Sequence, residues 1–246
     1  MALLEVEHLY KHFGGIHAVE DCSFSVQSGT VTSLIGPNGA GKTTAFNLIT
    51  GTVARTAGTI RFDGRDISNW PPHRVTRAGI SRTFQITRSL EEMSVLENLV
   101  VHAVPKTLGA LLGSAVLNHD ENRAMELLEF LGIDHLADEP AGTLSYGQRK
   151  LLELGAVLMS DPKLIMLDEP AGGVNPHLLE TIAERIVALN KQGITFLIVE
   201  HNMEFVMNLS NPVIVMAFGR VIAEGSPAEV QNDPAVLEAY LGGESA

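Results

Sequence analysis

The chain has 246 residues, a hydrophobic content of 45% and a formal net charge of −12 at pH 7. This length and apolar content predict one domain with a sizeable core, which subdomains can divide. The acidic balance argues against nucleic acid as the main partner, because neutralising phosphates requires a basic face. The single cysteine, Cys22, excludes an internal disulfide and is typical of a reducing compartment.

No targeting or membrane-spanning segment is expected. The first ten residues, MALLEVEHLY, carry acids where a signal peptide has a basic region. No apolar run approaches the roughly 18 to 20 residues that span a bilayer, so we expect a soluble protein. The run LGALLGSAVL at 108–117 is too short to cross a membrane; it either covers a local core or docks on a membrane protein.

The amino-terminal segment, up to about Asp66, contains three strand-like runs around a glycine-rich loop. They read VEHLYKHF, CSFSVQSG and GTIRFDG. Short runs of this kind, separated by turn residues, are typical of strands. We therefore expect a small antiparallel sheet that flanks the part of the chain containing the loop.

The glycine-rich loop matches a phosphate-binding motif. Residues 30–35 (TVTSLI) predict a buried strand, and residues 43–50 predict a helix that Gly51 stops. Between them the spacing G-x-x-x-x-G-K-T matches the P-loop, in which backbone N–H groups bind phosphates, the lysine reaches the β- and γ-phosphates and the threonine binds Mg²⁺. The alternative is a glycine-rich turn with an incidental lysine. The predicted nucleotide-binding residues here are Gly36, Asn38, Gly39, Ala40, Gly41, Lys42, Thr43 and Thr44, of which Thr43 is also a predicted Mg²⁺ ligand.

Helical patterns dominate residues 91–154. Ser94 and Glu97 predict a capping box, and residues 120–131 (DENRAMELLEFL) repeat apolar residues at helical spacing. Basic residues crowd the stretch before this region. They predict either a solvated basic face or a patch favoured by anionic lipid, and they are Arg74, Arg77, Arg82 and Arg88.

The motif LSYGQ at 144–148 predicts the start of a helix. Ser145 and Gln148 have the spacing of a capping box, and the helix is expected to run from about residue 148 to residue 159. A helix start with a free hydroxyl and the backbone amide of Gly147 is also an anion site. Because the P-loop already supplies one set of phosphate contacts, we expect this second site to act on nucleotide bound elsewhere.

Two acids follow a short apolar run. Residues 163–167 (KLIML) predict a buried strand, and Asp168 and Glu169 stand at its end, where parallel sheets bind ligands. Asp168 is placed to hold Mg²⁺, usually through its water shell. Glu169 points elsewhere and is placed to orient or deprotonate an attacking water. A solvated acidic turn before Pro170 is the alternative.

Together these motifs resemble the ATP-binding-cassette (ABC) ATPases, whose signature LSGGQ stands here as LSYGQ. The resemblance implies that Ser145, Gly147 and Gln148 close over ATP held by the P-loop of a second copy. Gln85, in SRTFQ, corresponds to the glutamine that touches Mg²⁺ and the attacking water. His201, in FLIVEH, corresponds to the histidine that contacts the γ-phosphate, although a lone histidine after a strand is more often solvated.

The resemblance also implies an adenine contact and a subfamily. Phe13 lies where the family places an aromatic ring on adenine, with core packing as the alternative and Tyr10 as the weaker candidate. The loop AGGVNP departs from the usual Leu-Asp ending, because Asn175 stands in place of the aspartate and loses its charge. This loop, TTAFNLITG and the tail GSPAEVQNDPAVLEAYLGG are similar to the ATPases of branched-chain amino acid importers. ATPases for urea and short-amide uptake and for lipopolysaccharide export have similar sequences in these stretches.

In the tail itself, Ser226 and Glu229 predict one capping box and Asp233-Pro234 predicts the start of a second short helix. The expected fold is α/β, a P-loop NTPase (RecA-like) core with a flanking antiparallel β subdomain and an α-helical signature subdomain. The division expected is residues 1–90 and 155–246 for the core and 91–154 for the helical part.

The expected function is ATP hydrolysis, with ATP and Mg²⁺, that powers a membrane transporter, and the expected transport is import of branched-chain or hydrophobic amino acids. The expected partners are a second ATPase subunit, a transmembrane permease docked near residues 86–101 and, indirectly, an extracytoplasmic binding protein. The chain would then lie on the cytoplasmic side of the membrane. A nucleotide kinase has no use for LSYGQ. A non-transport ABC ATPase acting on DNA or ribosomes typically carries two cassettes or a long coiled-coil insertion.

Overall fold

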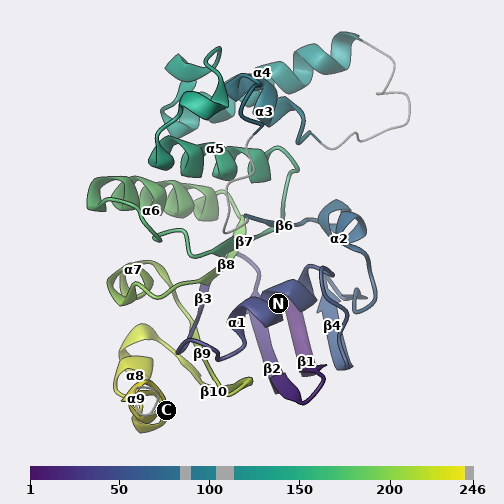
Figure 1. The fold of residues 1–246 in the computed structure, drawn as a ribbon, viewed down its shortest axis with the longest axis vertical. Coiled ribbons are helices and arrows are strands. Elements are labelled where there is room, and N and C mark those ends of the chain that lie inside the picture. The colour runs from purple at the N-terminus through teal and green to yellow at the C-terminus, as the bar shows by residue number, and fades with distance from the viewer. Residues whose placement is uncertain (84–89, 104–113, 242–246) are drawn as a thin grey trace.

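The computed structural model describes residues 1–83, 90–103 and 114–241, and the side chains of residues 114–117 and 241 are not described. The expectations for Gln85 and Arg88, for the start of the docking stretch at residues 86–89 and for residues 108–113 of the apolar run therefore lie outside the described residues. Within these ranges the chain folds into two sheets and a helical lobe (Figure 1).

The smaller sheet is antiparallel and comes from the amino-terminal segment. Its strands lie in the order β2-β1-β4-β5, and their bounds are β1 Ala2–Phe13, β2 Ile16–Gln27, β4 Ala57–Phe62 and β5 Arg65–Asp66. The three strand-like runs recognised in the sequence form β1, β2 and β4, so that prediction is confirmed. The long β1–β2 hairpin lies beside α1 in the lower part of Figure 1.

The larger sheet has the order β10-β9-β3-β8-β7-β6, in which only β10 is antiparallel to its neighbour. All residues of β3, β7, β8 and β9 are buried, as expected for parallel strands covered on both faces. The bounds are β3 Val31–Ile35, β6 Ile80–Arg82, β7 Leu164–Asp168, β8 Thr195–Val199, β9 Val213–Ala217 and β10 Arg220–Gly225.

The helices cover this sheet, and α3, α4 and α5 form the lobe at the top of Figure 1. Two short 3₁₀ segments, Asp134–Leu136 and Ala141–Thr143, connect α4 to α5. The helices are α1 Lys42–Ile49, α2 Pro72–Ala78, α3 Val95–Val100, α4 Ser114–Leu131, α5 Tyr146–Leu158, α6 Pro176–Lys191, α7 Met203–Leu209, α8 Pro227–Gln231 and α9 Pro234–Leu241.

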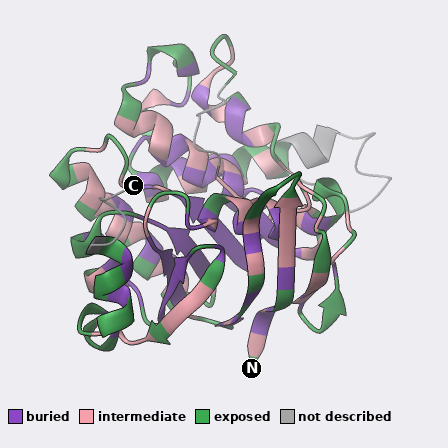
Figure 2. Ribbon diagram, turned by 60° about the horizontal axis from the view of Figure 1, so that its bottom comes forward, coloured by how far each residue is buried: buried purple, intermediate pink, exposed green. Residues whose placement is uncertain are grey.

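The core is split by the larger sheet, because alternate residues of a strand point to opposite faces. Leu164 and Met166 of β7 pack with the antiparallel sheet and α1. Ile165 and Leu167 pack with the helical lobe and α6. Figure 2 shows the resulting buried layer of strands between partly exposed helices. The edge where β3, β7 and β8 end is thus held between two apolar layers.

Most sequence predictions of local structure are confirmed. Ser94 caps α3 and Ser226 caps α8, each in a complete capping box with the residue three positions later. The signature helix differs at its start: α5 begins at Tyr146, because Ser145 is the N-cap and the helix follows it directly. The expected subdomain boundary after residue 154 falls within α5, so we propose that the helical subdomain extends to Leu158.

Candidate functional site

The P-loop connects β3 to α1 in a conformation that only glycine can adopt. Gly36 has φ 147° and Gly41 has φ 98°, both in the left-handed region. A Cβ on Gly36 would lie 2.0 Å from the carbonyl oxygen of Met216, and one on Gly41 would lie 2.3 Å from that of Ala18. The strands β9 and β2 therefore press directly on the loop and hold its backbone in place.

The helix that follows presents an open N-terminus. Gly41 is the N-cap of α1, no side chain among the described residues caps it, and the first turn contains no acid. The side chains of Asn38 and Thr43 are exposed at this end, and Thr44 is partly exposed. Free N–H groups and the positive end of the helix dipole make this a site for an anion such as phosphate.

Lys42 joins the loop to the acids. It is 6% exposed, and its Nζ donates hydrogen bonds to the carbonyl oxygens of Gly36, at 2.7 Å, and Pro37, at 3.0 Å. Burial lowers the pKa of the Lys42 ammonium, whereas the charges of Glu169 and Asp168 act in the opposite direction. The electrostatic interaction with both carboxylates means that the tertiary structure brings these parts of the sequence together.

Asp168 ends β7 as a buried carboxylate that is 2% exposed. Its Oδ2 accepts a hydrogen bond from Nη2 of Arg82 at 2.6 Å. Its Oδ1 has no hydrogen-bond partner among the described residues. A buried carboxylate oxygen without a donor is unfavourable unless a water or cation meets it, and Mg²⁺ with its water shell is a suitable group. The residues present therefore fit Mg²⁺.

Arg82 was missed as a functional residue, because the sequence placed it in a basic surface stretch. Its side chain is only 9% exposed, so the expectation of an exposed basic face is wrong at this position. Nη1 also donates to the Asn47 side chain at 2.6 Å, and the guanidinium lies 5.5 Å from the ring centre of Phe46. Arg82 is the last residue of β6, and only the pairing of β6 with β7 places it beside Asp168.

Glu169 and His201 lie next to each other at the sheet edge. Oε1 of Glu169 is 2.8 Å from Nε2 of His201, and the two side chains are 28% and 43% exposed. Glu169 has φ 51°, a left-handed conformation that is unfavourable for a non-glycine residue and is often found at functional sites. Both side chains are thus accessible to a ligand at the sheet edge where β7 and β8 end.

Glu200 is a second residue that the sequence reasoning missed. It is 3% exposed, and its carboxylate accepts hydrogen bonds from the backbone N–H groups of Ala171, at 2.5 Å, His201, at 2.8 Å, and Asn202, at 3.0 Å. This buried acid fixes the position of His201 relative to the loop after Asp168. An acid directly after a short, mostly apolar run (TFLIV) was the only signal in the sequence.

The signature motif lies on the helical lobe. Ser145 and Gln148 form the predicted capping box: the Ser145 side chain accepts from the Gln148 N–H at 3.3 Å, and the Gln148 side chain accepts from the Ser145 N–H at 2.8 Å. Tyr146, which replaces a glycine of the common motif, donates from its hydroxyl to the carbonyl oxygen of Gly172 at 2.9 Å. The signature is therefore tied to the loop after the two acids.

A pocket of about 600 Å³ surrounds this motif, and no P-loop residue lines it. Gly147 lies against α6, where an added Cβ would come within 2.2 Å of a methyl group of Leu178. Asn175 caps α6 by accepting from the Leu178 N–H at 3.0 Å, so the amide keeps the capping role of an aspartate. The signature and the P-loop are separate surfaces of one chain.

The candidate adenine contact is exposed. Phe13 ends β1 with 47% of its surface exposed, and the alternative of core packing is therefore excluded. Nζ of Lys11 lies 4.6 Å from its ring centre. Tyr10 is half-buried and the weaker candidate. Phe13 remains a predicted contact, since nearly half of its surface is accessible to a flat ligand.

The comparisons with known proteins identify the family. The family model described as "ABC transporter" matches residues 19–172. A relative from Archaeoglobus fulgidus, "Probable branched-chain amino acid transport ATP-binding protein LivG", is 44% identical and covers 98% of this chain and 96% of its own. The chain belongs to the ABC transporter family.

Solved structures agree with this membership of the ABC family. The nucleotide-free ATP-binding cassette of an ABC transporter is 40% identical with a TM-score of 0.87, and it matches over 98% of this chain and 99% of its own. The ADP conformation of such a cassette is 39% identical, has a TM-score of 0.86 and likewise matches over 98% of this chain and 99% of its own. A second family model, "Branched-chain amino acid ATP-binding cassette transporter", matches residues 220–246. Like these cassettes, the chain is a nucleotide-binding ATPase with an α/β P-loop fold.

In the part of the chain that the structure describes, no helix has the length and apolarity to cross a bilayer.

Proposed function

We propose that the chain is the ATP-hydrolysing subunit of an importer for branched-chain or other hydrophobic amino acids. The cargo rests on similarity: the Archaeoglobus relative bears that name, and the tail model matches residues 220–246. The hydrolytic part rests on one structural observation, the convergence of Lys42, Asp168, Glu169 and His201 at one edge of the sheet. These groups come from three separate parts of the sequence.

For binding, the backbone of residues 36–41 and the N-terminus of α1 would hold the phosphates of ATP. Lys42 would exchange its hydrogen bonds to the P-loop carbonyls for bonds to the β- and γ-phosphates, which are charge-assisted and stronger. Thr43 and Asp168 would hold Mg²⁺, which would neutralise charge on the phosphates. Gln85 is assigned to the same ion by resemblance. Phe13 would stack on the adenine.

For hydrolysis, Glu169 would orient the attacking water and accept its proton. His201, held at 2.8 Å from the Glu169 carboxylate, would position that carboxylate and contact the γ-phosphate. Glu200 fixes the backbone on which His201 stands, so hydrogen bonds within the protein support this geometry. Catalysis would then depend mainly on positioning and charge stabilisation, as is usual for phosphoryl transfer.

A second ATPase subunit would complete each site. Ser145, Gly147 and Gln148 lie on the helical lobe and do not share a pocket with the P-loop of the same chain. The helix start that they form would therefore contact ATP held by the partner. We further propose that a permease docks near residues 86–101, which would place the chain at the cytoplasmic face of the membrane, with the binding protein on the other side.

The test combines turnover with transport. In a strain that lacks the gene, the wild-type chain should restore uptake of labelled leucine, and Glu169→Gln should not, since the amide cannot accept the water's proton. The purified variant should still bind ATP and should hydrolyse it at least about tenfold more slowly, equivalent to about 1.4 kcal/mol in the barrier. Restored uptake of urea in place of leucine would replace the proposed cargo. Hydrolysis by Glu169→Gln at the wild-type rate would remove the proposed catalytic role.

A further inference from the structure

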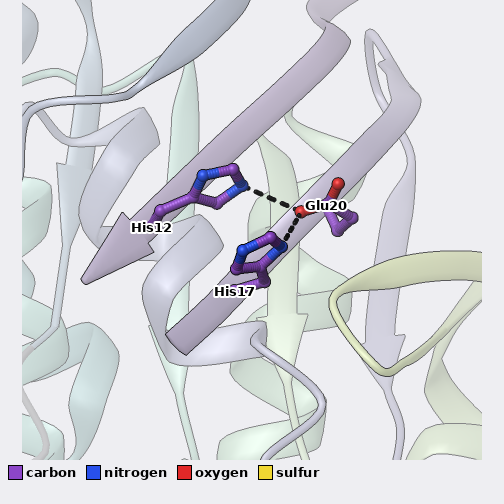
Figure 3. A group of neighbouring side chains, drawn as sticks. All are labelled: His12, His17 and Glu20. Atoms are coloured by element: carbon purple, nitrogen blue, oxygen red, sulfur yellow. Dashed lines mark hydrogen bonds and ion pairs between the residues drawn. The ribbon is translucent and has the colours of Figure 1, made fainter. Parts of the chain in front are cut away.

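Three potential metal ligands converge on the β1–β2 hairpin and are not used by the proposed ATP site. Nε2 of His12 lies 2.8 Å from Oε2 of Glu20, and Nδ1 of His17 lies 2.9 Å from the same oxygen. Figure 3 shows both rings pointing to this carboxylate from neighbouring strands. All three ligand atoms lie within 4.8 Å of one another. We propose that His12, His17 and Glu20 form a site for a divalent transition-metal ion such as Zn²⁺.

The hairpin register places these side chains together. His12 and His17 are Cα partners across the antiparallel pair, and side chains of directly opposed residues lie on the same face. Glu20 is held by its own backbone, whose N–H donates to the carbonyl oxygen of Gly219 at 2.9 Å. Two strands and a third segment therefore position the ligands, and no folding of a loop is required to bring them together.

The distances are compatible with one ion. Zn²⁺ lies about 2.0–2.2 Å from nitrogen and oxygen ligands, so two ligands at the tetrahedral angle lie about 3.3–3.6 Å apart. The two contacts with Glu20, at 2.8 and 2.9 Å, are slightly shorter than this spacing. The two ring nitrogens are no more than 4.8 Å apart, and closing the site takes a side-chain shift of at most about 1.5 Å. A fourth position would stay open for water.

The ligand types select the class of ion. Two imidazole nitrogens and one carboxylate suit zinc, copper or nickel, whereas magnesium and calcium prefer oxygen ligands alone. The two rings are stacked, with centroids 4.0 Å apart and planes 13° apart. Two imidazolium ions so close would repel each other. Two neutral rings that share a cation would not, because each ring nitrogen would bind the ion through its lone pair instead of donating an N–H to the one carboxylate.

The proposed metal site lies at the end of the hairpin that carries the predicted adenine contact. Phe13, the predicted adenine contact, is the last residue of β1 and directly follows His12, and the strand that contains Glu20 packs on the P-loop through Ala18 and Gly41. A bound ion would join β1 to β2 at the end that carries Phe13. It would restrict the motion of this end without using any residue assigned to ATP or Mg²⁺.

The experiment titrates the purified, nucleotide-free chain with ZnCl₂ in a calorimeter, and separately with MgCl₂. We expect one saturable Zn²⁺ site that Mg²⁺ does not occupy. His12→Ala, His17→Ala and Glu20→Gln should each lower the Zn²⁺ affinity at least about tenfold, because even the loss of a residue that only orients a ligand costs 10–100-fold. Thermal unfolding without metal establishes that each variant is folded.

His8→Ala is the matched control. His8 lies on the same hairpin and pairs with Asp21 at 2.7 Å, but it belongs to no group of three potential metal ligands among the described residues. This variant should keep the wild-type affinity. Absence of a saturable Zn²⁺ site in the wild-type chain would overturn the proposal, as would an affinity unchanged by all three substitutions. Equal loss of binding in His8→Ala would overturn it too, by placing the ion elsewhere on the hairpin. The absorption spectrum with Co²⁺, compared between wild type and His17→Ala, gives a second readout of nitrogen ligation.

Discussion

Arg82 provides the sharpest test of how the acidic site is supported. Replacing it by Met removes the guanidinium but keeps an unbranched apolar chain of similar length beside Phe46. Asp168, which is 2% exposed, would then lose the partner that donates to it at 2.6 Å. Asn47 would lose its hydrogen bond at the same time. A buried carboxylate would be left without its closest positive charge.

The expected loss of stability is large for a single substitution. Removing one partner of a buried ion pair costs about 3–5 kcal/mol, because an uncompensated charge remains in the interior. We expect the lower end, about 3 kcal/mol, since the charge of Lys42 also interacts with Asp168. Native proteins have a free energy of unfolding of about 5–15 kcal/mol, so this change is readily measured.

The assay is urea unfolding, followed by the fluorescence of Trp70, the one tryptophan of the chain. The buffer contains neither Mg²⁺ nor nucleotide. Arg61→Met is the matched control, since Arg61 pairs with Glu7 at 2.6 Å but both side chains are about half-exposed, at 41% and 51%. An exposed pair of this kind contributes at most about 1 kcal/mol.

A double variant separates the ion pair from simple packing. In Arg82→Met with Asp168→Asn, neither charge of the pair remains, and the combined loss should be smaller than the sum of the two single losses by at least about 1 kcal/mol. A loss for Arg82→Met within about 0.5 kcal/mol of that for Arg61→Met, a margin close to the error of additivity, would refute the argument. Strict additivity in the double variant would refute it as well.

Three further predictions concern other parts of the chain. Ser145→Asp keeps the N-cap of α5 but adds a negative charge, so it should leave ATP binding by the monomer intact and prevent ATP-dependent dimerisation in size-exclusion chromatography. Ser145→Asn adds no charge and should still dimerise, so loss of dimers in both variants would contradict a charge effect. Burial raises the pKa of the Cys22 thiol from 9.0 to about 12, so iodoacetamide at pH 8 should label the chain only in urea, as measured by mass spectrometry. Between pH 9 and pH 12 only the unfolded thiol ionises, so the contribution of Cys22 to stability is lost as the pH rises above 9. Leu90, with 48% of its surface exposed, should tolerate substitution by Asp with little change in thermal stability or ATP binding, while co-purification with the permease is lost; unchanged co-purification would count against docking at this stretch.

The sequence alone determined the local structure and the chemistry of the motifs. The P-loop, the three capping boxes at Ser94, Ser145 and Ser226 and the buried strand before Asp168 depend on residues close together in the chain, so spacing and residue type were sufficient to predict them. The family resemblance added Phe13 and His201, of which the structure shows an exposed ring and a contact with Glu169.

Only the tertiary structure decided which charges are paired and which side chains are neighbours. Arg82 looked like one of several surface arginines, but the pairing of β6 with β7 buries it against Asp168. Glu200 and the contact of Tyr146 with Gly172 depend on the order of strands and on the packing of α5 near α6. The grouping of His12, His17 and Glu20 depends on the register of one hairpin. Such long-range pairings follow from how the sheets are assembled, because no periodicity along the chain encodes which strand lies beside which.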